Sequence, residues 1–124
     1  MVLDHIILHV NDVEASLRFY TEILGLTNEG KSEPFSVLRV TSELTIQLAP
    51  WGTKGGEHLA FALPRAEFEE VFQRVREAGI EFGDSFHSVG NMKGPGQEEG
   101  ARGIGASLYF FDPSRHLIEI RHYE

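Results

Sequence analysis

One segment toward the C-terminal end of the sequence reads Leu108-Tyr109-Phe110-Phe111-Asp112-Pro113-Ser114-Arg115-His116-Leu117-Ile118-Glu119-Ile120-Arg121-His122. Its first part is aromatic and its last part is aliphatic, and both compositions favour β-strands. Asp112-Pro113 separates the two parts and is a turn signal, because the proline ring presets φ. The segment therefore predicts a β-hairpin.

Glu119 is the unusual residue of this hairpin, because it stands inside the apolar run Leu-Ile-Glu-Ile. Alternation along a strand places Leu117, Glu119 and Arg121 on one face of the sheet. Ile118 and Ile120 then share the opposite face. Two interpretations remain open on this segment alone: a solvated carboxylate on an amphipathic strand, or a metal ligand on the concave face of a sheet.

The composition predicts a single globular domain, since the chain has 124 residues of which 41% are hydrophobic. It has no cysteine, which excludes disulfides and thiolate metal sites. No apolar run is long enough for a bilayer, and the first residues lack the basic start of a signal peptide, so we expect a soluble cytoplasmic protein that binds no membrane. A net charge of −8 argues against binding of nucleic acid.

The order of predicted elements repeats along the chain. The first half predicts a strand, a helix and three more strands, over residues 3–10, 12–24, 26–33, 35–41 and 44–49. After a glycine-containing linker, the second half predicts a strand, a helix, a strand, a glycine-rich loop and the hairpin, over residues 57–63, 65–78, 80–86, 90–105 and 108–122. Gly25 and Gly79 are expected to end the two helices.

The residues themselves also repeat. Asp4-His5-Ile6-Ile7-Leu8 matches Glu57-His58-Leu59-Ala60-Phe61, and Leu44-Thr45-Ile46-Gln47-Leu48 matches His116-Leu117-Ile118-Glu119-Ile120. His5 is therefore the counterpart of His58, and Gln47 is the counterpart of Glu119. Two equivalent halves predict a pseudo-twofold structure.

With these motifs in this order, the chain resembles the vicinal oxygen chelate superfamily, which includes glyoxalase I, extradiol dioxygenases, fosfomycin-resistance enzymes and bleomycin-resistance proteins. The resemblance implies an α+β domain of two βαβββ modules, residues 1–52 and 55–124, whose strands form an incomplete barrel around one divalent metal ion (Fe, Mn, Ni, Co or Zn). The metal ligands that it implies are His5, His58 and Glu119. It also implies a homodimer that acts on a small oxygen-chelating molecule.

Gln47 departs from the glyoxalase I pattern, which has a second glutamate at this position. Two imidazoles and one carboxylate are the facial triad of non-haem Fe(II) enzymes. We therefore lean slightly to dioxygenase-like chemistry over a glyoxalase-type lyase or isomerase, with Gln47 near the substrate, as a weak fourth ligand or as a group that orients water. A metal-free binder of the bleomycin-resistance kind is the alternative from another class.

Three other residues are candidates for contact with the substrate. His9 shares the strand face of His5 and, like Tyr109, is a candidate for proton transfer. His9 could equally be a wall of the pocket, and the alternative for Tyr109 is a simple core aromatic. Arg102 lies in the glycine-rich segment 90–105, which we expect to cover the site as a lid, and it is placed to meet an anionic substrate.

Overall fold

The computed structural model describes all residues, 1–124, and divides into two compact units, Met1–Gly55 and Gly56–Glu124. None of the helices has the length and apolarity needed to cross a membrane.

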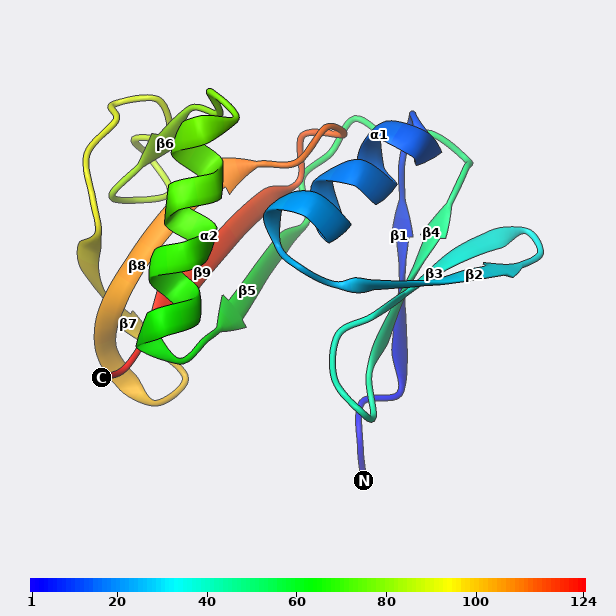
Figure 1. The fold of residues 1–124 in the computed structure, drawn as a ribbon, viewed down its shortest axis with the longest axis horizontal. Helices are drawn as coiled ribbons and strands as arrows, with labels where there is room; N and C mark the ends of the chain where they lie inside the picture. The colour runs from blue at the N-terminus through cyan, green and yellow to red at the C-terminus, as the bar shows by residue number, and fades with distance from the viewer. The chain divides into compact units, whose positions relative to one another are not determined.

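The first unit has one four-stranded sheet (Figure 1). Its elements are β1 (His5–His9), α1 (Val13–Arg18), the π-helix η1 (Phe19–Ile23), β2 (Thr27–Ser32), β3 (Phe35–Arg39) and β4 (Thr45–Ala49). The strand order is β1-β4-β3-β2, with β1 parallel to β4 and the other pairs antiparallel. This is one βαβββ module.

The second unit repeats this arrangement and adds a strand. Its elements are β5 (His58–Ala62), α2 (Arg65–Glu77), β6 (Phe82–Gly83), β7 (Gly96–Gly100), β8 (Gly103–Phe111) and β9 (Leu117–His122). The strand order is β5-β9-β8-β6, β5 is parallel to β9, and β7 pairs with the other end of β8. The expected α+β class with paired βαβββ modules is confirmed, and so is the β8–β9 hairpin.

The strand register confirms the internal repeat at the level of single residues. Ile7 stands opposite Gln47 in the β1–β4 pair, and Ala60 stands opposite Glu119 in the β5–β9 pair. In each unit the partner of the polar residue comes two positions after the histidine, His5 or His58. Residues two apart on a strand share a face, so each histidine lies on the same sheet face as Gln47 or Glu119 of its own unit.

The helices begin and end for local reasons. Asp12 caps α1, since its Oδ1 accepts a hydrogen bond of 3.0 Å from the Ala15 amide. Gly25 and Gly79 follow the helical segments with φ of 79° and 69°, which glycine adopts without a steric penalty. The single helix expected over 12–24 differs in one respect: its last turn, 19–23, is a π-helix.

Each unit has its own apolar core. In the first unit, Leu8, Leu38, Ile46 and Leu48 of the sheet are buried, as is Tyr20 of the helical segment. In the second, α2 lies across one face of the sheet (Figure 1) and contacts β9. The buried side chains there are Phe68, Val71 and Val75 of α2 with Leu108, Phe110, Ile118 and Ile120 of the hairpin.

Two expectations for the segment before the hairpin are wrong in part. The strand expected over 80–86 is only Phe82–Gly83. The chain turns back after it, and the backbone amides of Gly90 and Met92 both donate to the Phe82 carbonyl. The glycine-rich segment 90–105 is not wholly a loop, because β7 forms within it and pairs with the start of β8.

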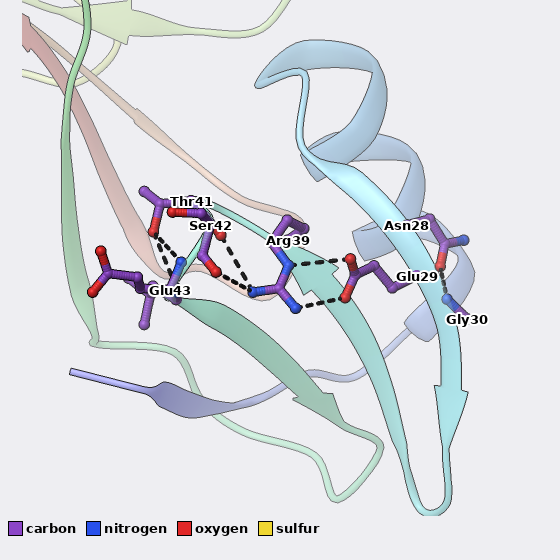
Figure 2. Close-up of polar contacts among 8 residues, drawn as sticks. Asn28, Glu29, Gly30, Arg39, Thr41, Ser42 and Glu43 are labelled. Atoms are coloured by element: carbon purple, nitrogen blue, oxygen red, sulfur yellow. Dashed lines mark hydrogen bonds and ion pairs between the residues drawn. The ribbon is translucent and has the colours of Figure 1, made fainter. Parts of the chain in front are cut away.

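A β-bulge shapes the outer hairpin of the first unit. The β2–β3 register shifts between Asn28 and Gly30, so Glu29 is the unpaired extra residue. Its carboxylate makes two hydrogen bonds with the Arg39 guanidinium, of 3.1 and 3.0 Å (Figure 2). Arg39 also donates to the carbonyls of Thr41 and Ser42 and so braces the turn into β4.

Candidate metal centre

His58 and Glu119 form a close pair in the second unit. Parallel pairing of β5 with β9 places both side chains on the face opposite α2, and His58 Nε2 lies 2.9 Å from Glu119 Oε1. The Glu119 side chain is 6% exposed and that of His58 is 47% exposed. The interpretation of Glu119 as a solvated surface carboxylate is therefore wrong.

The second oxygen of Glu119 is held by Arg121. Arg121 Nη1 lies 2.6 Å from Glu119 Oε2, and both side chains are buried. Removal of one partner from such a buried pair costs about 3–5 kcal/mol, because the other charge stays buried and uncompensated. Burial alone lowers the pKa of Arg121, but the hydrogen bond with Glu119 and the charge of its carboxylate outweigh it and raise this pKa above the ordinary value.

A pocket of about 220 Å³ adjoins Glu119. Its lining combines small β5 side chains with the β7–β8 turn and the end of the chain: Ala60, Ala62, Glu99, Gly100, Ala101, Arg102, Glu119, Arg121 and Tyr123. Arg102 therefore reaches the pocket that contains Glu119. Its guanidinium lies 4.4 Å from the centre of the Tyr123 ring, a cation–π contact.

Tyr109 stands beside Glu119 on the neighbouring strand of the same sheet. The two are register partners in the β8–β9 pair, and the Tyr109 ring centre is 6.3 Å from that of His58. Burial raises the pKa of Tyr109, and the charge of Glu119 adds to this, against a hydrogen bond with Ser107 that lowers it. The net shift is upward, so the phenol keeps its proton at neutral pH and can donate a hydrogen bond.

His5, Gln47 and His9 share one face of the first sheet. Asp4 Oδ2 lies 2.7 Å from Nδ1 of His5, and a carboxylate on that nitrogen fixes the ring orientation with Nε2 available to a metal. Gln47 is half-buried in the centre of the sheet. The His9 ring makes an edge-on contact of 5.2 Å with Trp51.

The structure thus groups the predicted residues in two sets. His58, Tyr109, Glu119 and Arg102 belong to the second unit, and His5, His9 and Gln47 belong to the first. No group of three or more His, Cys, Asp or Glu side chains is gathered at one point. The full set of three ligands therefore stays a prediction. The pair of His58 and Glu119 fits a divalent metal by its chemistry, since neutral imidazole and carboxylate donors suit Fe, Zn, Mn, Co and Ni.

Sequence reasoning assigned no role to Arg121. The signal was present, because strand alternation already put Arg121 on the face of Glu119. The sequence does not show which groups the Arg121 guanidinium contacts. In the structure it also donates hydrogen bonds to the carbonyls of Glu98, Glu99 and Gly103.

The similarity of this chain to known proteins extends over nearly all of its length. The profile of the Glyoxalase/Bleomycin resistance protein/Dioxygenase superfamily matches residues 2–120. Virulence protein STM3117 of Salmonella typhimurium is 28% identical over 98% of this chain and 83% of its own length. Glutathione transferase FosA of Serratia marcescens is 27% identical over 95% of this chain and 78% of its own length. Among solved structures, oxidase ChaP-H1 superposes with a TM-score of 0.82 at 29% identity, covering 100% of this chain and 97% of that one.

Proposed function

Because the chain belongs to the Glyoxalase/Bleomycin resistance protein/Dioxygenase superfamily, we propose that it is an enzyme that uses one divalent metal ion to act on a small oxygen-chelating substrate. The observation that carries the proposal is the 2.9 Å contact between His58 Nε2 and the buried carboxylate of Glu119. A buried carboxylate directed at a half-exposed imidazole, beside a pocket, is an arrangement suited to holding a cation.

His58 and Glu119 would hold the metal together with His5, whose ring is oriented by Asp4. When bound, the ion would act as a Lewis acid on a chelated pair of substrate oxygens, or as the site where O₂ and substrate meet. Fe, Mn, Ni, Co and Zn all accept this donor set, so the choice among them is left to measurement.

The other residues would serve the substrate. Tyr109 would donate a hydrogen bond or a proton to a substrate oxygen, since its raised pKa keeps the phenol neutral. Arg102 would pair with an anionic group in the pocket that it shares with Glu119. Gln47 would contact the substrate as a neutral amide, and His9 would transfer a proton or form part of the wall.

Dioxygenase-like chemistry is the reaction type we favour, slightly. Gln47 supplies no second carboxylate base, which an isomerase of the glyoxalase type needs. The likeness to oxidase ChaP-H1 at 29% identity points in the same direction. A glyoxalase-type lyase or isomerase is the second candidate, and a metal-free binder of small molecules is the third.

A homodimer in the cytoplasm completes the proposal. The sheets leave the strands β1 and β5 at one edge each, and exposed edges are normally covered by pairing or by a partner. A net charge of −8 disfavours nucleic acid as a partner.

The deciding experiment compares two reactions on one preparation. Protein loaded in turn with each of the five metals is given a vicinal aromatic diol with O₂, or a hemithioacetal without it. We expect O₂ uptake that requires an added metal and that is lost in Glu119→Ala. Uptake that survives both a chelator and Glu119→Ala would contradict the proposal, and hemithioacetal turnover alone would favour the second candidate.

A further inference from the structure

We propose that Arg121 is a positioning residue that presents Glu119 as a one-oxygen ligand and ties the β7–β8 hairpin to that ligand. The inference rests on the proposed function, because it takes Glu119 as a metal ligand. It adds a link between the hairpin that carries Arg102 and the carboxylate that lines the same pocket.

The two oxygens of Glu119 have separate partners. Oε2 is held by Arg121 Nη1 at 2.6 Å, and Oε1 lies 2.9 Å from His58 Nε2. A carboxylate with one oxygen in a charge-assisted hydrogen bond cannot rotate freely. Arg121 therefore leaves Oε1 as the oxygen that is directed toward the imidazole, and this oxygen would bind an ion held together with His58.

The same guanidinium reaches both strands of the hairpin. Nη2 donates to the carbonyls of Glu98 at 2.8 Å and Gly103 at 3.5 Å, and Nη1 donates to that of Glu99 at 3.4 Å. These carbonyls flank the turn that contains Arg102. A planar guanidinium can span several acceptors at once, whereas the single ammonium of a lysine cannot hold this geometry.

Two glycines allow close approach around this contact, Gly100 to the Arg121 guanidinium and Gly105 mainly to the backbone of His122. A Cβ on Gly100 would collide with the Cζ and Nε of Arg121 and with the Tyr123 hydroxyl, and one on Gly105 would collide with the His122 carbonyl. Gly100 is not in the left-handed region, so its role here is to allow close approach rather than an unusual backbone angle.

The Arg121 side chain bonds to both Glu119 and the β7–β8 hairpin. A displacement of the hairpin must therefore change the hydrogen bond between Arg121 and Glu119, and a displacement of Glu119 must change the contacts of Arg121 with the hairpin. Coupling of this kind is reciprocal in free energy. A purely structural arginine would stabilise the hairpin without affecting metal affinity, so the two roles can be separated by measurement.

The first arm of the test uses metal-free protein and follows hydrogen exchange of the amides of residues 97–105. Arg121→Met should lose protection there, and so should Glu119→Gln, although the Glu119 carboxylate bonds to Arg121 and His58 and not to residues 97–105. The double variant should lose little more than either single one. If Glu119→Gln leaves hairpin exchange unchanged, Arg121 does not transmit the link and the proposal is wrong.

The second arm measures the dissociation constant of the metal alone, by titration calorimetry. Arg121→Lys and Gly100→Ala should each weaken metal binding by about tenfold or more, as loss of an outer-sphere partner does. Gly100→Ala keeps both charged side chains and displaces the guanidinium together with the Tyr123 hydroxyl. Arg76→Met is the matched control, since Arg76 packs over Phe72 on the exposed side of α2, and the metal affinity of this variant should be unchanged.

The outcomes keep the two proposals apart. Wild-type protein that binds no metal contradicts the proposed function, while the hairpin arm still decides whether Arg121 links the two parts. Wild-type protein that binds metal, with affinity unchanged in Arg121→Lys and Gly100→Ala, overturns the positioning role and leaves the proposed function intact.

Discussion

The Nε2 atom of His58 lies 2.9 Å from Oε1 of Glu119, and the parallel pairing of β5 with β9 is what puts it there. A half-exposed imidazole and a buried carboxylate thus share one point on the open face of the second sheet. Arg121 holds the other oxygen of the carboxylate and prevents it from turning away.

Purified protein should carry about one divalent ion per chain, because three donors of this kind bind such ions strongly. His5→Ala, His58→Ala and Glu119→Ala should each abolish retention in elemental analysis of protein prepared without chelator. Retention should also weaken as the pH falls toward ~6, because only neutral histidine is a ligand. His87→Ala is the control and should retain the metal, as His87 is exposed and its ring contacts that of Phe86. Retention of metal by all three variants would show that the ligands are assigned wrongly.

Native protein should turn over a hemithioacetal negligibly with added Ni, Co, Zn or Mn, since the neutral amide of Gln47 cannot accept a proton from carbon. Gln47→Glu should raise this turnover by about tenfold or more, as a positioned base does. Gln47→Met, of similar size and without a carboxylate, should gain nothing in the same spectrophotometric assay. Strong isomerase activity of the native protein would reverse the order of the two candidate reactions.

In solution the protein should be a homodimer, since each sheet has open edges that pairing would cover. Light scattering at micromolar concentration should give about twice the chain mass of 13.9 kDa. The same mass should be found after treatment with a chelator if sheet edges, rather than the ion, hold the subunits together. A mass equal to one chain would be contrary to this expectation.

The Glu29–Arg39 pair gives a pH-dependent prediction. The hydrogen bond from Arg39, together with its charge, lowers the pKa of Glu29 below the ordinary value of 4.5 (Figure 2). A carboxyl whose pKa is lower in the folded state stabilises the fold above its ordinary pKa, and this contribution is lost as the pH falls through the lowered value. Arg39→Met should return the Glu29 pKa toward 4.5 in an NMR titration of the side-chain carboxyl.

Lys31→Met is the control for that titration. Lys31 lies on the same strand and pairs with Glu33 at 3.9 Å, so its loss removes one cation without contact to Glu29. If Lys31→Met raised the Glu29 pKa as much as Arg39→Met, the cause would be the general charge of the hairpin and not the bidentate pair.

The sequence alone was sufficient to predict the internal repeat and the sheet face on which Glu119 lies. The matched segments around His5 and His58 predicted equivalent strands, and the observed pairing of Ile7 with Gln47 and of Ala60 with Glu119 follows from that match. Strand alternation also placed Glu119 on the face opposite the core, because its neighbours Ile118 and Ile120 must be buried.

Strand β7 was beyond local reasoning. Its sequence, Gly-Gln-Glu-Glu-Gly, contains no residue with high strand propensity. It pairs with β8 in a register that the Arg121 guanidinium supports from more than twenty positions away. The burial of Glu119 could not be predicted from the local sequence either, since it depends on the β7–β8 hairpin and on β5, which are distant in sequence.

Two of the arginine–glutamate pairs in the chain, Glu29–Arg39 and Glu119–Arg121, should respond differently to ionic strength. At 0.15 M salt the Debye length is about 8 Å, and mobile ions screen exposed charges while they reach buried ones poorly. Glu29 and Arg39 are each more than a third exposed, so added salt should weaken their contact and soften the outer hairpin of the first unit. Glu119 and Arg121 are 6% and 4% exposed and should hold their geometry in the same buffer. Salt is therefore a means of loosening one hairpin of this protein while the pocket is left intact.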